Sequence, residues 1–192
     1  MSTISTNSYT IGQIDLFFTA SIAHASLLLA SPAVSAGMGG MFRTTGRNFG
    51  NIVTAEISPD VSYVEHWISD NGQRKKDKVA VNTVNLTIPF TFDEINAANL
   101  KKFFLASSLT TKKLAVFEEP LTEGCAQLVF TTSVGQDMTY FIPKCTIRPD
   151  GALSTNAEDW WEAPMVLEVL YYNTAPWATK PYGFVNASAI TS

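Results

Sequence analysis

Residues 50–69, GNIVTAEISPDVSYVEHWIS, form two rows of side chains when they are counted by twos. The first row is apolar apart from Glu65 and contains Val53, Ala55, Ile57, Pro59, Val61, Tyr63 and Trp67. The second row is small and polar in its middle and contains Ile52, Thr54, Glu56, Ser58, Asp60, Ser62, Val64, His66 and Ile68. Alternation with a period of two over this length predicts a long β-strand with one apolar face and one polar face.

A second alternating segment, VAVNTVNLTIPF at residues 79–90, predicts the partner of that strand. Its apolar side chains are Val84, Leu86, Ile88 and Phe90, and its polar ones are Thr83, Asn85 and Thr87. Asp70-Asn71-Gly72 is a turn signal between the two segments, and the basic run QRKKDK follows it. The two strands together are expected to make a long hairpin with a projecting loop at about residues 69–79.

The rest of the chain predicts one helix and several further strands. TFDEINAANLKKFFLAS, at residues 91–107, has the capping-box spacing at Thr91 and Glu94, with Asp93 as an alternative N-cap. Its apolar side chains keep helical spacing apart from Asn99, so the helix is expected to cover the apolar side of a sheet. Strands are expected at residues 12–19, 114–119, 125–132, 138–148 and 165–172. The sequence therefore predicts a mainly β fold with one flanking helix, in a single domain over residues 1–192.

Residues 16–42, LFFTASIAHASLLLASPAVSAGMGGMF, contain no Asp, Glu, Lys or Arg. A signal peptide is disfavoured because no basic residue precedes this segment and Asp15 lies directly before it. A transmembrane helix is disfavoured because Ser, Thr, Gly, His24 and Pro32 dilute the apolar side chains. We expect an N-terminal apolar arm that is buried or covered by a neighbouring subunit.

Composition argues against several classes of function. The net charge of −4 and the sequence pI of about 5.1 disfavour a nucleic-acid binder of high affinity, which needs Lys and Arg against phosphates. They do not exclude a surface past which DNA moves without binding. The two cysteines, Cys125 and Cys145, lack metal-site spacing and are expected to be buried thiols, with a single bridge left open.

No catalytic constellation is recognisable, so we predict no enzyme and no catalytic, metal or cofactor residues. His24 and His66 lack ligand spacing. The acidic cluster Glu118, Glu119 and Glu123 lacks the alternating oxygen ligands of a calcium loop and is expected to be a solvated face. The pair Trp160-Trp161 is expected to pack in the core and at an edge, the alternative being a sugar-binding platform.

Several short motifs follow one another in a fixed order. They are Glu65-His66-Trp67, Gly72 with Arg74 and Lys76-Asp77, Asp93 with Ile95, Asn99 and Leu100, and PDGALS at 149–154 ahead of Asp159-Trp160. In this order and spacing, over about residues 11–183, the chain resembles the major tail protein, or tail tube protein, of long-tailed bacteriophages of the siphophage type. It departs from that family at residues 16–42, where a short polar loop would be expected.

The resemblance implies a structural virion protein that assembles in the host bacterial cytoplasm and is located in the virion tail. Six subunits would form a ring, each giving strands to one closed inner β-barrel with the helix outside. Stacked rings would form the tube through which phage DNA passes. The implied partners are other copies of the chain, the tape measure protein and phage DNA in the lumen, and the tail terminator and distal tail proteins, with no membrane and no cofactor.

In this interpretation the polar face of the hairpin lines the water-filled lumen, and the apolar row lies outside, packed under the helix. The implied lumen residues, here called the polar row, are Thr54, Glu56, Ser58, Asp60, Ser62, Thr83, Asn85 and Thr87. A wall without Lys or Arg gives DNA phosphates no strong contact and repels them weakly over a Debye length of about 8 Å at physiological salt. Without the resemblance, ordinary solvent on one side of a sandwich would explain the polar row equally well.

The basic run at the hairpin tip is expected to join one ring to the next. Its residues are Arg74, Lys75, Lys76, Asp77 and Lys78, and Glu118, Glu119 and Glu123 are the expected acidic partner patch. The alternatives are a tube protein of a contractile tail or injection machine, or a monomeric β-sandwich carbohydrate-binding module.

Overall fold

The computed structural model describes residues 12–22, 25, 47–110, 113–132, 137–155 and 160–186. These residues are mainly β and contain one short helix, α3 (Ala97–Phe103). The strands are β1 (Gly12–Thr19), β2 (Arg47–Asn48), β3 (Ile52–Ala55), β4 (Ser58–Asp70), β5 (Gln73–Phe92), β6 (Ser107–Thr110), β7 (Lys113–Ala115), β8 (Glu123–Thr132), β9 (Asp137–Pro149), β10 (Ala163–Val169) and β11 (Phe184–Asn186).

All strands except β6 and β7 belong to one open antiparallel sheet in the order β2-β1-β8-β9-β10-β5-β3. In addition β4 pairs with β5, and β11 pairs with β9. The strands predicted at 12–19, 125–132, 138–148 and 165–172 correspond to β1, β8, β9 and β10, whereas β2, β6 and β11 were not predicted. The segment 114–119 is β-structure only as far as Ala115.

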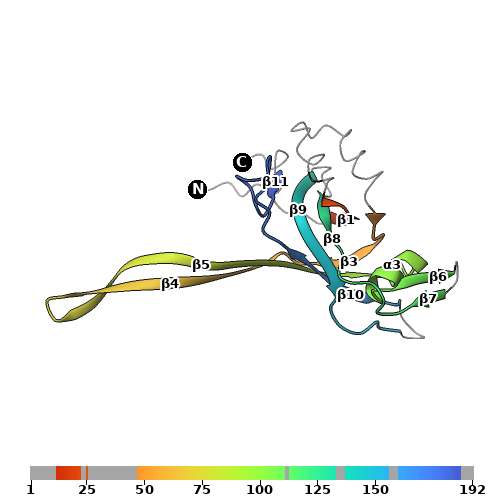
Figure 1. Ribbon diagram of the computed structural model, residues 1–192, viewed down its shortest axis with the longest axis horizontal. Coiled ribbons are helices and arrows are strands. Elements are labelled where there is room, and N and C mark those ends of the chain that lie inside the picture. The colour runs from red at the N-terminus through yellow and green to blue at the C-terminus, as the bar shows by residue number, and fades with distance from the viewer. Residues whose placement is uncertain are drawn as a thin grey trace, which may run out of the picture.

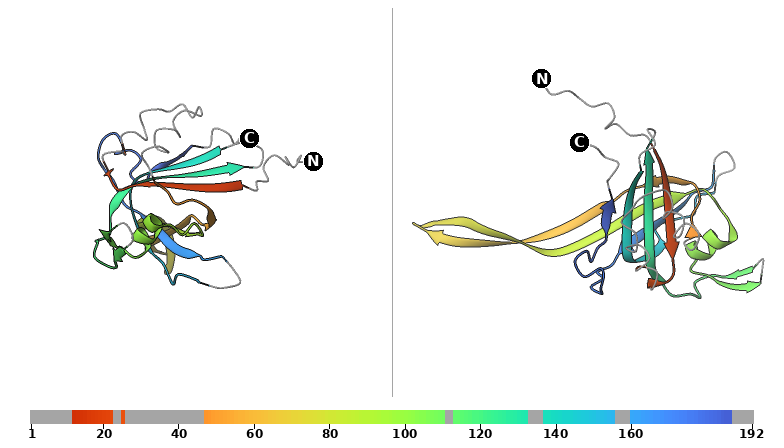
Figure 2. Two further views of the ribbon diagram at one scale, coloured as in Figure 1. Left: turned by 90° about the vertical axis from the view of Figure 1, so that its right-hand side faces the viewer. Right: turned by 90° about the horizontal axis from the view of Figure 1, so that it is seen from above.

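The main core lies between the two ends of this sheet. Leu16 and Leu128 come from β1 and β8, while Phe90 and Phe92 come from β5, and all four belong to one buried cluster. Figure 2 shows β1, β8 and β9 running across the direction of β4 and β5. The two ends of one sheet therefore pack face to face, as in a sandwich.

A second, smaller cluster covers the opposite face of β1 and β8. It contains Cys125, Val129 and Trp177, and the indole Nε1 of Trp177 donates to the Ala25 carbonyl at 2.9 Å. Cys145 lies in the main core instead, on the other side of the sheet, so the two free thiols do not form a bridge. Burial raises the pKa of Cys125 to about 12 and that of Cys145 well above its usual value, which keeps both thiols protonated and unreactive.

The hairpin of β4 and β5 projects far from the body of the molecule (Figure 1). Its turn is Asn71-Gly72, with φ angles of 51° and 76°, which match the two positive values of a type I′ turn. Instead of the loop expected over about residues 69–79, only these two residues are outside the strands. The basic run therefore lies on β5 itself.

The start of α3 differs from the prediction. Thr91 and Phe92 are the last residues of β5, because they pair with Pro164 and Ala163 of β10, and the N-cap is Asn96. The Asn96 side chain accepts hydrogen bonds from the backbone N–H groups of Ala98 and Asn99 at 3.1 and 2.9 Å. Strand pairing with a segment distant in sequence has overridden the local capping signal.

Asn99, the polar exception in the helical pattern, is fully buried for a clear reason. Its amide Nδ2 donates to the Phe49 carbonyl at 2.9 Å and to the Glu94 carbonyl at 2.8 Å. It thus ties α3 to the segment that enters β3. Phe103, on the same helix, lies in the main core.

Most of the apolar segment 16–42 lies outside the described residues, including His24 and Leu27 to Leu29. Its first residues do not belong to an arm, because Leu16, Phe17 and Phe18 are buried within β1. No helix among the described residues is long and apolar enough to cross a membrane.

Replacing Asn99 by Ala is expected to lower the free energy of unfolding by about 1–3 kcal/mol, because two carbonyls lose their donor in a buried site. Urea unfolding of the purified protein measures this. Asn82→Ala is the matched control, since Asn82 is exposed at a bulge in β5 and should tolerate the change. Equal unfolding midpoints for the two variants would contradict the role assigned to Asn99.

Candidate functional site

The polar row occupies one face of the hairpin. Ser58 lies opposite Thr87, Asp60 opposite Asn85, and Ser62 opposite Thr83. Residues opposite each other on antiparallel strands share a face. The hydroxyls of Ser62 and Thr83 are 2.5 Å apart, and the Thr83 N–H also donates to Ser62 Oγ at 3.1 Å. Whether this face lines a channel remains a prediction.

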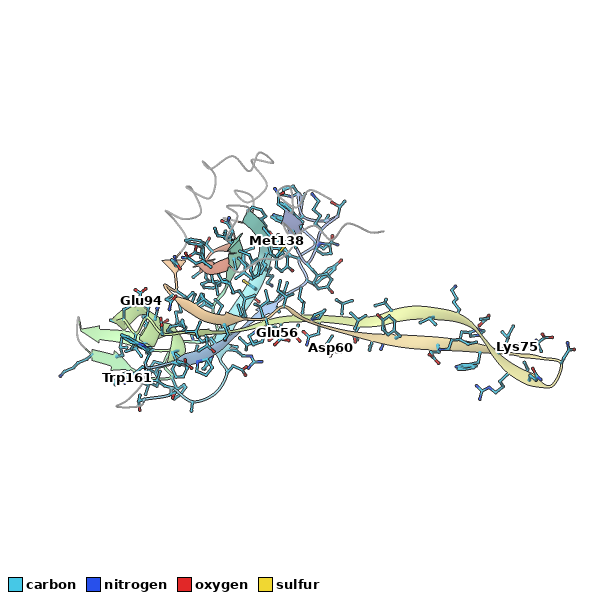
Figure 3. All side chains as sticks on the ribbon, turned by 180° about the vertical axis from the view of Figure 1, so that it is seen from behind. Glu56, Asp60, Lys75, Glu94, Met138 and Trp161 are labelled. Atoms are coloured by element: carbon cyan, nitrogen blue, oxygen red, sulfur yellow. The ribbon has the colours of Figure 1, made fainter. Side chains whose placement is uncertain are left out.

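The other two members, Thr54 and Glu56, lie where β3 gives way to β4. Thr54 pairs with Thr91, and the Glu56 N–H donates to the Pro89 carbonyl at 3.0 Å. An open depression of about 400 Å³ lies beside them, and Thr91 and Asp150 also line it. Figure 3 shows Glu56 and Asp60 near the root of the hairpin, far from Lys75 at its tip.

Two further strands extend this face, and sequence analysis did not include them. Glu168 of β10 lies beside Thr87, and Thr146 of β9 lies beside Glu168. Arg148 Nε lies 3.9 Å from a Glu168 carboxylate oxygen, and Arg148 Nη1 lies 3.9 Å from one of Asp150. The alternation in MVLEV was visible, but only the strand order places it beside β5. The face is thus mixed in charge near the body and acidic along the hairpin root.

The opposite face of the hairpin is apolar and uncovered. Its exposed side chains are Tyr63 (60%), Val81 (58%), Val79 (51%), Trp67 (43%) and Val84 (41%). The prediction that the apolar row packs under the helix is wrong for the projecting part of this chain, because α3 lies at the far end from the hairpin tip (Figure 1). At the base of the hairpin, Ala55 does pack against the core that contains Phe103 of α3. Beyond its base, the hairpin pairs with no described strand other than its own two.

The charges near the hairpin tip largely pair across the two strands. Lys75 Nζ lies 2.6 Å from Asp70 Oδ2, Lys76 pairs with Glu65, and His66 Nδ1 lies 2.7 Å from Asp77 Oδ1. Glu65, the exception in the apolar row, is therefore one half of a cross-strand ion pair. These pairs are all exposed, so each contributes little to stability.

Two cations near the tip have no carboxylate partner in the described part of the chain, Arg74 and Lys78. The guanidinium of Arg74 lies 5.9 Å from the centre of the Trp67 ring, and Lys76 Nζ lies 5.4 Å from it. The tip therefore presents an aromatic ring with cations around it.

The three glutamates of the expected acidic patch are not equivalent. Glu119 pairs with Lys101 at 2.8 Å and Glu123 with Lys144 at 3.0 Å. Glu118 is exposed and has no ion pair among the described residues. The described residues also contain no group of acidic, His or Cys side chains suited to a metal ion.

Trp160 and Trp161 are not core residues, contrary to the expectation from sequence. Trp160 is 80% exposed and Trp161 is 48% exposed. Both precede the bridge between Glu162 and Ser154, at the start of β10. Figure 3 shows Trp161 at the end of the molecule away from Lys75.

Comparison with known families gives one match, over residues 41–135, to a family described as "Protein of unknown function UCP028589". The matched region includes the whole hairpin, α3 and β8. No curated protein matches the chain. The class that the fold itself defines is a mainly β protein with an open antiparallel sheet and a projecting two-stranded arm.

Replacing Tyr63 and Val81 together by Thr is expected to leave the free subunit about as stable as before, since both side chains are exposed and threonine suits a strand. The lost cross-strand pair contributes only about 0.2–1 kcal/mol. Ile88→Ala, in the fully buried part of β5, should instead lower the free energy of unfolding by about 2–5 kcal/mol. Thermal and urea unfolding compare the two, and a large loss in the double variant would show that the apolar face is covered within one subunit.

Proposed function

We propose that this chain is a structural subunit of a phage tail tube, in which stacked hexameric rings conduct DNA into the host cell. The observation that carries the proposal is the hairpin of β4 and β5, with the polar row on one face and an uncovered apolar row on the other. The resemblance described above supplies the identity of the assembly. The proposed location is therefore the virion tail.

The uncovered apolar row supports an assembly rather than a free monomer. An exposed apolar surface that continues along one face of a projecting arm is typical of a protein–protein contact. In a closed inner barrel, this face would be outermost in the wall and covered by neighbouring subunits. The six-membered ring and the closure of the barrel are parts of this proposal.

The free edge of β4 supports the same conclusion. Among the described strands, β4 pairs only with β5, which leaves one side of a 13-residue strand without a partner. Proteins seldom leave so long an edge open, because it pairs with other chains. Closing several such hairpins into a barrel removes the edge.

The polar row suits a wall along which DNA slides. Hydroxyl and amide side chains keep the wall hydrated, while Glu56 and Asp60, which have no ion pair in the described chain, repel phosphates. Glu168 adds a third carboxylate to this wall. Arg148 lies close to both Glu168 and Asp150, so the positive charge of Arg148 is largely balanced. Such a wall gives DNA few counterion-releasing contacts to hold it.

A tube protein of a contractile tail or of an injection machine would use the same hairpin, and a sheath protein as partner would distinguish it. A carbohydrate-binding module is a second candidate, favoured by the exposure of Trp160 and Trp161. Negative-stain microscopy of the purified protein separates these classes. Rings or tubes would support the conduit, whereas a monomer that persists at high concentration and binds glycans through these tryptophans would overturn it.

Replacing both Glu56 and Asp60 by Lys is expected to leave tubes assembled but to slow genome ejection, because phosphates would then meet cations in place of carboxylates. Ejection kinetics of particles carrying the variant measure this, with tube lengths checked by microscopy. The neutral variant Glu56→Gln with Asp60→Asn is the matched control and should eject at nearly the normal rate. Normal ejection by the Lys variant in complete particles would mean that these side chains do not face DNA.

A further inference from the structure

The β7–β8 loop, residues 116–122, presents an apolar and acidic surface that the proposed channel does not use. Phe117 is 71% exposed, Val116 is 51% exposed and Leu121 is 47% exposed. Glu118, which directly follows Phe117, has no ion pair among the described residues. An exposed Phe with two exposed aliphatic neighbours is a typical feature of a protein contact surface.

The loop is held in place rather than loose. The Phe117 N–H donates to the Phe104 carbonyl at 2.9 Å, and the Glu119 N–H donates to the Leu105 carbonyl at 2.9 Å. Lys101 of α3 also pairs with Glu119 at 2.8 Å. Two backbone hydrogen bonds and one ion pair therefore fix the loop against the end of α3.

Phe117 also adopts a strained backbone conformation, with a φ of 59°. Positive φ is unfavourable for a residue with a bulky side chain and costs about 1–3 kcal/mol unless the surroundings enforce it. The Phe117 ring is nonetheless 71% exposed, so burial of this ring does not offset the strain in the free chain. Strain of this kind is most often found at binding sites.

We propose that this loop receives the hairpin tip of a second copy of the chain. The inference rests on the proposed tube, since it names the surfaces through which successive rings meet. The tip presents Trp67 with Arg74 beside it on the same face, whereas Lys78, opposite His66, lies on the other face of the ribbon. The loop presents Phe117 with Glu118 beside it. Each end thus combines an exposed aromatic ring with a charge that has no ion pair among the described residues, and the two charges are opposite.

The positions of the two surfaces fit a contact from head to tail. The hairpin tip and the β6–β7 end of the molecule, which the loop follows, lie at opposite ends of the long axis (Figure 1). A contact between two different surfaces on identical subunits builds an open filament or stack unless the rotation between successive copies closes it into a ring. Aromatic burial would supply most of the affinity, and the charges would set the register.

This contact replaces the simple pairing of the basic run with the acidic cluster. Lys75, Lys76, Glu119 and Glu123 already have partners within their own subunit, so a contact between rings does not need them. Arg74 and Glu118 lie beside the two aromatic rings and have no ion pair among the described residues. Exposed ion pairs are individually weak, which is why the aromatic rings are needed as well.

Disulfide trapping tests the contact directly. The double variant Ser69→Cys with Val116→Cys places one thiol beside Arg74 at the tip and one beside Phe117 in the loop. Mild oxidation should give a ladder of covalent multimers that reductant reverses, because a head-to-tail contact links every copy to the next. The native thiols are fully buried and should stay out of the reaction. Ser69→Cys with Val185→Cys is the control, since Val185 on β11 is similarly exposed and should not react with the tip.

The variant Phe117→Gly distinguishes a role of the Phe117 ring in the contact between copies from a role in the stability of the fold. Glycine adopts positive φ without strain, so the thermal midpoint of the free subunit should stay equal or rise. The rate of tube growth should fall by about tenfold or more, which corresponds to about 1.4 kcal/mol of lost contact. A variant that loses both stability and growth would show that the ring serves the fold and would overturn the proposal.

Charge exchange adds a test of register. Glu118→Arg should slow growth, and Arg74→Glu in the same chain should restore part of it. Suppose that the wild-type protein forms tubes, that the variant with Ser69→Cys and Val116→Cys gives no ladder, and that Phe117→Gly grows normally. This result would overturn the contact but leave the proposed tube intact. If the wild-type protein forms neither rings nor tubes, the proposed function fails, and the ladder alone then decides whether the tip meets the loop.

Discussion

The rest of the structure depends on the continuity of β5, which runs without interruption from Gln73 to Phe92. Its last residues, Ile88, Phe90 and Phe92, are anchored in the main core, and its first half forms the projecting arm with β4. An isolated two-stranded hairpin is at best marginally stable in water. Here one strand is clamped between β3 and β10 at its base, so the arm extends a rigid, already paired element.

Two β-bulges change the shape of the arm. Register shifts occur between Ser62 and Tyr63 and between His66 and Trp67. Bulges bend a ribbon and increase its twist. The first extra residue is Asn82 on β5, so Val81 and Val79 remain on the same face as Val61 and Tyr63 beyond the bulge. The arm is thus curved as well as two-faced, which suits a wall that curves around an axis better than it suits a flat sheet.

Local patterns predicted the arm well, because alternation and a turn signal are properties of neighbouring residues. The polar row, the Asn71-Gly72 turn and the strands β1, β8, β9 and β10 follow from such patterns. The errors concern contacts between distant segments. Thr91 looked like a helix cap until its pairing with Pro164 placed it in a strand. Glu168 and Arg148 could not be assigned to the polar face without the strand order.

Alternation also cannot tell what lies against a face. The same apolar row would fit a helix of the same chain, a second sheet or another subunit. In the described part of the chain, neither a helix nor a second sheet covers its exposed side chains. Trp160 and Trp161 illustrate the same limit, because large aromatic side chains are usually buried and these two are exposed. In both cases the sequence shows what kind of side chain is present, but it does not show which residues pack against that side chain.

The ion pairs along the arm place charge beside its exposed apolar surface, and in the proposed assembly they would limit association with a wrong partner. Glu65, Asp70 and Asp77 place carboxylates among the apolar and basic side chains of a long ribbon whose two edges are both unpaired beyond its base. Charged side chains at such an edge discourage pairing with an arbitrary strand, since a wrong partner would bury them without compensation. In the free subunit the pairs are exposed and weak, so a correct partner can rearrange them at little cost. The arm therefore combines apolar surface that favours assembly with charges that restrict which surface it accepts.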